Sequence, residues 1–313
     1  MSSGPADHGS LPPGKAIEVS EGIFAYVQPD GGWWINNTAF LVGSQGVISI
    51  DACATQRRTL DYLDAIGAIT PRPVRALINT HHHGDHTYGN YLFDTAAIIA
   101  HDNVRSQLLA AGPPRSAPVW TETDWGDIQL EPPFITYADQ ITVHSDDLAC
   151  QVIHAGRPAH TNNDSYVWIP DRELLIAGDL LFNGGTPFLL MGSITGAIAV
   201  LRERIAPLGA RTIIPGHGQV CGPEVIDEVL GYLGYVLRVA EQARAVELTP
   251  LQAAREFGPG PYAQLLDSER LVGNLHRAYA ELDGAAPGAP IDQAAALADM
   301  VTYNGGKPLT CLA

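Results

Sequence analysis

The stretch Thr80-His81-His82-His83-Gly84-Asp85-His86 places four histidines and one aspartate within six consecutive positions, 81–86. It directly follows Val74–Ile78, a mostly apolar run typical of a buried strand. In extended backbone, side chains two residues apart point to the same side, so His81 and His83 can reach one metal ion. Asp85 and His86 are adjacent and point apart, so they can offer ligands to a second metal ion nearby.

The residue types in this stretch narrow the choice of metal. Imidazole and carboxylate groups suit Zn²⁺, although iron and manganese also accept them. The competing interpretation is a solvated polar loop without a metal, and the crowding of so many ligand groups argues against it. We expect His82 to lie behind the metal site or to face solvent. Gly84 allows the backbone to turn sharply between the two ligand pairs.

Strand and helix patterns on both sides of this stretch predict an α/β protein. Short apolar or β-branched runs alternate with helical spacing of apolar residues in each half of the chain. Two of the strand runs end in a carboxylate, GVISID in Asp51 and LLIAGD in Asp179. The predicted strands are Ile17–Val27, Ala39–Val42, Gly46–Asp51, Val74–Ile78, Ser165–Ile169, Glu173–Ala177 and Thr212–Ile214, and the predicted helices span 56–67 and 196–208.

The last third of the chain has a different pattern. From about Pro223 the sequence turns helical, and an Ala/Pro/Gly-rich stretch over 284–296 predicts a loop. We therefore expect a flexible N-terminal tail over residues 1–14, a catalytic domain over 15–222, and a helical extension over 223–313 packed on the same domain.

Three further motifs follow the histidine cluster: Gly156-Arg157-Pro158-Ala159-His160-Thr161, Ala177-Gly178-Asp179 and Pro215-Gly216-His217-Gly218. Each alone is weak evidence. Together with Asp51 and the H-x-H-x-D-H pattern of residues 81–86, they occur in order at the ends of predicted strands. In these motifs the chain resembles the metallo-β-lactamase superfamily, over residues ~16–220.

The resemblance implies a four-layer αββα sandwich with the site at one edge. It also implies two metal positions with a carboxylate that bridges them, and Asp51 as a carboxylate that supports the ligand loop from behind. The implied ligands are His81, His83 and His160 for one metal, Asp85, His86 and His217 for the other, and Asp179 as the bridge. The other histidines, His8, His101, His144, His154 and His276, are interpreted as structural.

This ligand set predicts a dinuclear zinc hydrolase that cleaves an acyl bond, in a thioester, a lactone or a related ester or amide. Zinc lowers the pKa of bound water to about 7, which provides hydroxide at neutral pH. Asp85 is the predicted catalytic residue, because it would orient that hydroxide and pass a proton to the leaving group. No G-x-S-x-G motif surrounds a serine, so the sequence does not favour a serine hydrolase.

Three alternatives remain open. One is a phosphodiesterase or nuclease of the same fold, and another is a sulfur dioxygenase with a single iron. The third is a sensor or binding protein without activity. Some β-lactamases of the superfamily have cysteine or serine where this chain has Asp179, whereas an aspartate is typical of its thioester hydrolases, lactonases and phosphoesterases. The resemblance therefore favours these over a β-lactamase.

The sequence also indicates a small-molecule substrate with an apolar or aromatic portion. Trp33 and Trp34 follow a Gly31-Gly32 turn, and the resemblance implies that this turn forms a flap over the metals. Residues 183–191 are mostly apolar. If Trp33 and Trp34 lie in a strand, their side chains point to opposite faces. We then expect one of them to cover the site and the other to pack inward.

The composition of the chain indicates which partners and which cellular compartment to expect. The 313 residues carry a net charge of -16, which argues against nucleic-acid and anionic-membrane partners. The scattered cysteines Cys53, Cys150, Cys221 and Cys311 are interpreted as free thiols in a reducing compartment. The N-terminus lacks the basic start and apolar run of a signal peptide, so we expect a cytoplasmic protein. A homo-oligomer is compatible with the sequence.

Overall fold

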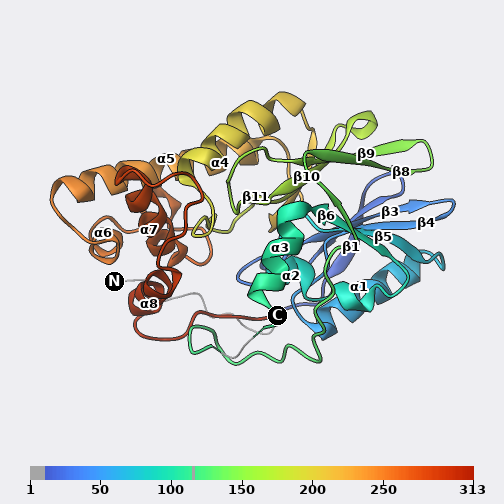
Figure 1. The fold of residues 1–313 in the computed structure, drawn as a ribbon, viewed down its shortest axis with the longest axis horizontal. Helices are drawn as coiled ribbons and strands as arrows, with labels where there is room; N and C mark the ends of the chain where they lie inside the picture. The colour runs from blue at the N-terminus through green and yellow to red at the C-terminus, as the bar shows by residue number, and fades with distance from the viewer. Residues whose placement is uncertain (1–10, 115–116) are drawn as a thin grey trace.

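Two β-sheets packed face to face form the centre of the molecule, and helices cover both outer sides (Figure 1). The structure is a computed structural model and describes residues 11–114 and 117–313. This is the predicted four-layer αββα arrangement. Most of the predicted N-terminal tail, residues 1–10, lies outside the described residues.

The first sheet has seven strands in sequence order, antiparallel from β1 to β4 and parallel from β4 to β7. The second sheet has five strands in the order β12-β11-β10-β9-β8. The strands of the first sheet are β1 Lys15–Ser20, β2 Ile23–Val27, β3 Thr38–Gly43, β4 Gly46–Ile50, β5 Val74–Ile78, β6 Ala97–His101 and β7 Ile135–Tyr137. Those of the second are β8 Gln140–Ser145, β9 Leu148–His154, β10 Ser165–Ile169, β11 Leu174–Phe182 and β12 Thr212–His217.

Parallel pairing in both sheets brings strand ends together. In the first sheet Ile50 pairs with Ile78, so the residues that follow β4 and β5 are neighbours. In the second sheet β11 and β12 are parallel, and Phe182 pairs with His217. Loops at the carboxyl ends of parallel strands meet at one edge of a sheet, which is where α/β proteins usually place their sites.

Three apolar clusters hold the layers together. The first fills the space between the sheets and includes Ile50, Ile78 and Ile176. The second packs α1 (Gln56–Ile69) against the outer face of the first sheet. The third and largest joins the second sheet to α4 (Ile194–Val200) and to the C-terminal helices.

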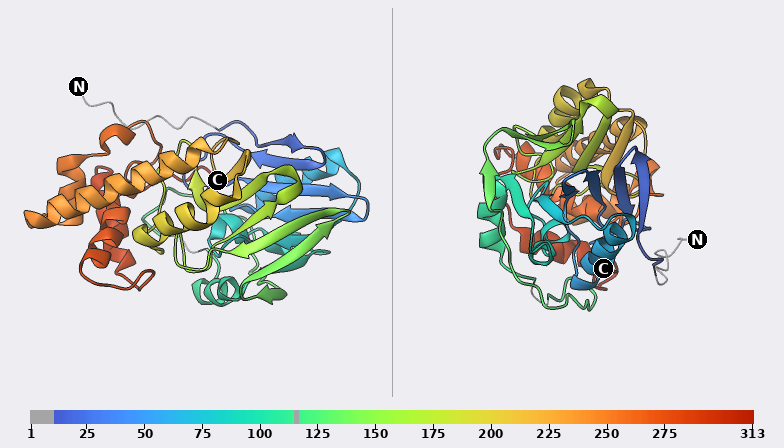
Figure 2. Two further views of the ribbon diagram at one scale, coloured as in Figure 1. Left: turned by 90° about the horizontal axis from the view of Figure 1, so that it is seen from above. Right: turned by 90° about the vertical axis from the view of Figure 1, so that its right-hand side faces the viewer.

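The C-terminal region is helical, as expected, and lies at one end of the molecule (Figure 2). Its helices α5 and α7 make extensive contacts with each other. The helices are α5 Glu224–Ala245, α6 Pro250–Phe257, α7 Arg270–Leu282 and α8 Gln293–Tyr303. None of the helices in the described residues combines the length and apolar content needed to cross a membrane.

Two predicted elements differ from the structure. The strand predicted over Ile17–Val27 is a hairpin of β1 and β2, because Gly22 adopts a φ of 71° and turns the chain. The loop predicted over 284–296 ends early, because the side chain of Asp292 accepts a hydrogen bond from the backbone N–H of Ala295 and caps α8.

Candidate metal centre

Asp51 links the ends of β4 and β5 at the base of the centre. Its Oδ1 accepts a hydrogen bond from the backbone N–H of Thr80 at 2.7 Å, and its Oδ2 accepts one from the Thr80 hydroxyl at 2.8 Å. The same Oδ2 lies 2.8 Å from Nδ1 of His86. Asp51 therefore holds the imidazole of His86, at the end of the short helix α2 (Gly84–Thr87), with Nε2 turned toward the centre.

The first ligand cluster combines His81, His83, His160 and Asp179, whose ligand atoms all lie within 4.8 Å of one another. Nδ1 of His83 is 3.2 Å from Nε2 of His81 and 2.8 Å from Nε2 of His160. Oδ2 of Asp179 lies 3.3 Å from Nε2 of His160. Three imidazole nitrogens and one carboxylate oxygen therefore converge on one point, a donor set that suits zinc.

The second cluster combines Asp85, His86, His217 and again Asp179, within the same 4.8 Å limit. Nε2 of His86 is 3.1 Å from Oδ1 of Asp179, and Nε2 of His217 is 3.4 Å from Oδ2 of both Asp179 and Asp85. Because Asp179 belongs to both clusters, the two positions are adjacent. The structure thus brings together all seven residues that the sequence predicted as ligands, here called the metal floor.

Hydrogen bonds at the far side of four imidazoles set their tautomers. An N–H that donates to an outer acceptor leaves the other ring nitrogen as a lone-pair donor that points into the centre. The outer pairs are His81 Nδ1 with Thr80 Oγ1 at 3.1 Å, His160 Nδ1 with the Phe188 carbonyl at 2.5 Å, His217 Nδ1 with the Gly31 carbonyl at 3.2 Å, and His83 Nε2 with Met191 Sδ at 3.2 Å.

The electrostatics of the metal floor fit a cation. Burial lowers the pKa of His81 and of His83 well below the ordinary value, which keeps these imidazoles neutral. Burial alone would raise the pKa of Asp179, but the neighbouring imidazoles of His217 and His86 hold it well below its ordinary value. Within the described chain, His86 Nε2 and Asp179 Oδ1 lie 3.1 Å apart and are buried without a hydrogen bond of good geometry. Buried polar atoms left in this way are costly, and a cation bound next to both of them would remove that cost.

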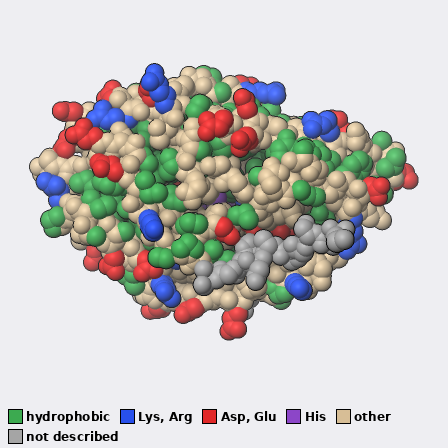
Figure 3. Space-filling view, turned by 180° about the vertical axis from the view of Figure 1, so that it is seen from behind, with side chains coloured by type: hydrophobic (Ala, Val, Ile, Leu, Met, Phe, Trp, Pro, Cys, Tyr) green, Lys and Arg blue, Asp and Glu red, His purple; other side chains and the backbone are tan. Residues whose placement is uncertain are grey.

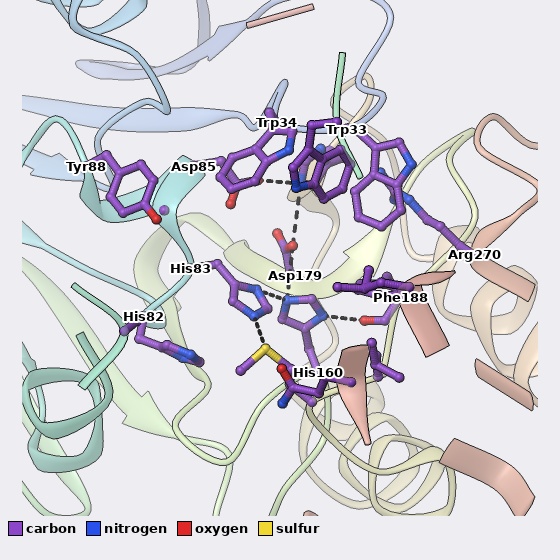
Figure 4. Close-up of a pocket in the computed structure, with 18 of the residues that line it drawn as sticks. Trp33, Trp34, His82, His83, Asp85, Tyr88, His160, Asp179, Phe188 and Arg270 are labelled. Carbon is purple, nitrogen blue, oxygen red and sulfur yellow. Dashed lines mark hydrogen bonds and ion pairs between the residues drawn. The ribbon is translucent and has the colours of Figure 1, made fainter. Parts of the chain in front are cut away.

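A cavity of about 310 Å³ opens above the metal floor (Figure 4). Apart from the floor, its lining is mostly apolar. Six aromatic side chains, here called the aromatic wall, line it: Trp33, Trp34, Tyr88, Trp120, Phe182 and Phe188. This arrangement suits a ligand with an apolar body and a polar group directed at the floor.

The expectation that only one of the two adjacent tryptophans reaches the cavity is wrong, because both line it. The segment is not a strand, and Trp34 adopts a φ of 67°, so the alternation of a strand does not apply. The guanidinium of Arg270 lies 3.9 Å from the ring centroid of Trp33, whose Nε1–H donates to Glu269 at 2.6 Å. Arg58 donates to the backbone carbonyl of Trp34 at 2.8 Å.

No sequence motif marks Arg58, Glu269 or Arg270, and Arg58 lies far from the other two in the chain. His82 lines the cavity but is buried, with Nδ1 close to the side-chain amide of Asn163. Burial lowers the pKa of His82 to about 4. It is therefore a neutral residue behind the ligands and does not face solvent.

Among the described residues, the histidines interpreted as structural lie outside both clusters. His101 and His154 stack on each other with ring centroids 3.8 Å apart, and His276 pairs with Asp299 at 2.8 Å. His144 lies on β8, and His8 falls outside the described residues. All four cysteines are free, as expected.

Comparison with known proteins matches residues 31–217 to the family model described as the metallo-beta-lactamase superfamily. The chain belongs to this superfamily. Metallo-beta-lactamase neighbours among solved structures support the fold. The structure of a metallo-beta-lactamase from Pontibacter korlensis superimposes with a TM-score of 0.59 at 15% identity, covering 71% of this chain and 99% of that one. The DIM-1 metallo-beta-lactamase gives a TM-score of 0.58 at 18% identity, covering 72% and 99%.

Two curated relatives of this metallo-beta-lactamase superfamily member are more informative about activity. The 2,4-dinitroanisole O-demethylase subunit alpha of Nocardioides sp. (strain JS1661) is 24% identical over 207 residues, 65% of this chain. The alignment spans only about half, 55%, of that subunit's length. The acyl-coenzyme A thioesterase MBLAC2 of Bos taurus is 23% identical over 230 residues, covering 62% of this chain and 81% of that protein. Family and site together confirm the expected enzyme class, a metal-dependent hydrolase.

Proposed function

We propose that the protein is a dinuclear zinc hydrolase that cleaves the acyl bond of a small substrate with an apolar or aromatic body. The observation that carries the proposal is the pair of ligand clusters sharing Asp179 beneath an aromatic wall. In this proposal the metal floor supplies all the ligands. His81, His83 and His160 would hold one ion, Asp85, His86 and His217 would hold the other, and Asp179, which belongs to both clusters, would be available to each.

Two bound zinc ions would supply Lewis acidity and a low pKa for water at the floor of the cavity. The protein's own contribution is proton transfer and orientation. Asp85 lines the cavity, and its side chain keeps 12% exposure against 4% for Asp179. The carboxylate of Asp85 can therefore accept the proton of the attacking water and return it to the leaving group.

The aromatic wall supports a substrate with a small apolar body. The cavity volume of about 310 Å³ lies at the lower end of the ~300–1,000 Å³ range typical of ligand sites. An acyl group of modest size fits this volume, whereas a large polar group attached to the acyl group would have to remain outside the cavity. The similarity to an acyl-coenzyme A thioesterase supports an acyl bond as the target.

Cleavage of an activated aryl ether is a second candidate. The six aromatic side chains of the wall suit a flat aromatic ring, and the chain is similar to part of a 2,4-dinitroanisole O-demethylase subunit. A phosphodiesterase or nuclease is less favoured, because the chain carries a net charge of -16. On the face shown in Figure 3, Lys and Arg side chains lie singly among acidic and apolar groups.

A substrate panel tests the proposal. Zinc-loaded protein should be assayed with aryl and alkyl thioesters, lactones, β-lactams, phosphodiesters and 2,4-dinitroanisole. The proposal expects the highest kcat/KM on thioesters, lactones or esters with a compact apolar acyl group. Highest activity on dinitroanisole would select the aryl-ether alternative, and highest activity on phosphodiesters would overturn the acyl-bond proposal.

A further inference from the structure

Helix α7 of the C-terminal region carries a row of buried polar residues. Arg270, Asn274 and Arg277 are spaced by four and three positions, so they lie on one face of the helix. Each is at most 1% exposed. Burying a guanidinium or an amide is costly unless its hydrogen bonds are satisfied. Arg277 makes no ion pair within the described residues, so its hydrogen bonds to carbonyl groups must offset this cost.

Most of the hydrogen bonds of this row go to a single segment, the backbone of residues 186–190. Arg277 donates twice to one carbonyl, and Asn274 both donates to and accepts from the segment. The bonds are Arg270 to Thr186 O at 2.9 Å, Asn274 to Pro187 O at 2.7 Å, Leu189 N to Asn274 Oδ1 at 2.8 Å, and Arg277 Nε and Nη2 to Leu190 O at 3.1 and 2.7 Å.

This segment and the residue that follows it, Met191, contact two residues of the metal floor. The Phe188 carbonyl accepts the hydrogen bond from Nδ1 of His160, and Met191 Sδ lies 3.2 Å from Nε2 of His83 (Figure 4). Outer contacts of this kind fix the orientation and the tautomer of a ligating imidazole. A continuous path of contacts therefore runs from α7 through residues 186–191 to the three-histidine cluster.

We infer that α7 positions the metal site of the three-histidine cluster, with Asn274 and Arg277 as positioning residues that act through residues 186–191 on His160 and His83. The inference rests on the proposed two-metal centre and adds a role for a helix outside residues 31–217, the part matched by the family model. The other cluster has different supports. His86 is held by Asp51 and His217 by the Gly31 carbonyl, and among the described residues neither Asn274 nor Arg277 hydrogen-bonds to these supports.

The test measures zinc affinity separately at each position, by competition with a chromophoric chelator. His217→Ala leaves the three-histidine cluster complete, and His81→Ala leaves the other cluster with its own histidines. Arg277→Met is introduced into both backgrounds, and cobalt spectra report the ligand geometry. We expect zinc affinity to fall about 10–100-fold in the His217→Ala background, the range seen when outer supports of ligands are lost. Affinity in the His81→Ala background should not change.

Two further variants make the result unambiguous. Met191→Leu removes the contact to His83 without disturbing a buried charge, and it should weaken the same position even if Arg277→Met folds poorly. Arg255→Met is the control, because Arg255 is exposed and, among the described residues, its side chain hydrogen-bonds only to the Thr302 carbonyl. Equal weakening at both positions, or at neither, overturns the inference. Failure of the parent protein to bind two zinc ions overturns the proposed centre itself and the inference with it.

Discussion

The metal floor and the aromatic wall of the cavity are assembled in different ways. The floor comes from short motifs that lie in or after strands, with Asp179 within β11 and His217 at the end of β12, and parallel strand pairs bring those motifs together. The wall comes mostly from residues outside the strands, with Phe182 at the end of β11. Two of its three tryptophans, Trp33 and Trp34, are held by Arg58 from the first third of the chain and by Glu269 and Arg270 from the last third. The floor is therefore built from motifs at strands, whereas most of the wall is built from residues outside strands that are held by contacts distant in sequence.

Substitution in the floor should have the largest effect. Asp85→Asn removes the carboxylate that accepts and returns the proton, so kcat should fall on the order of 10²-fold or more. The melting temperature should change little, because Asp85 lines the cavity and does not belong to a packed core. Steady-state kinetics with metal analysis of the same sample check this. Near-normal kcat at full metal content would remove Asp85 from the mechanism.

Trp33 is the part of the wall that also supports the fold. It is 9% exposed and packs against Trp120 and Phe188, with Arg270 over its ring. Trp33→Ala should lower the free energy of unfolding by ~3–5 kcal/mol and raise KM. Denaturant unfolding together with kinetics measures both effects. A stable variant with normal KM would show that Trp33 contributes to neither.

Trp34 should affect binding more than stability. It is partly exposed and contacts Trp120, Trp125 and Tyr88 by ring edges or faces. Trp34 also lines the cavity, where it would contact the apolar body of the substrate. Because this contact with substrate would be the same in the ground state and the transition state, Trp34→Ala should raise KM more than it lowers kcat. Kinetics on the best substrate of the panel provide the measurement. A lowered kcat at constant KM would instead connect Trp34 to the chemistry of the floor.

Removal of the metal tests whether the aromatic wall binds a ligand without a metal at the floor. Protein stripped by a chelator should lose activity but still bind an apolar aromatic product analogue, because the packing of Trp33 and Trp34 against Trp120 involves no metal ligand. Quenching of tryptophan fluorescence by the analogue should give a Kd close to that of the zinc-loaded protein. Complete loss of binding would mean that the floor also shapes the wall.

The two regions also differ in how far the sequence predicted them. All seven floor residues were identified from the sequence, because the ligands lie in short linear motifs at the ends of predicted strands. The expected fold then brings these strand ends together. The relation of Trp33 to Trp34 was not predicted, because a positive φ at Trp34 breaks the alternation assumed for a strand. The polar row of α7 was missed because Arg270, Asn274 and Arg277 form ordinary polar positions in a helical pattern, and only packing shows that they are buried.

The metal content of active protein tests the central claim most directly. Protein purified without chelator should be analysed for zinc, iron and manganese, and its activity should be measured on the same sample. Two ligand clusters that share Asp179 predict two zinc ions per chain, with activity proportional to zinc occupancy. A single iron per chain with full activity, unchanged on addition of zinc, would contradict the dinuclear zinc centre.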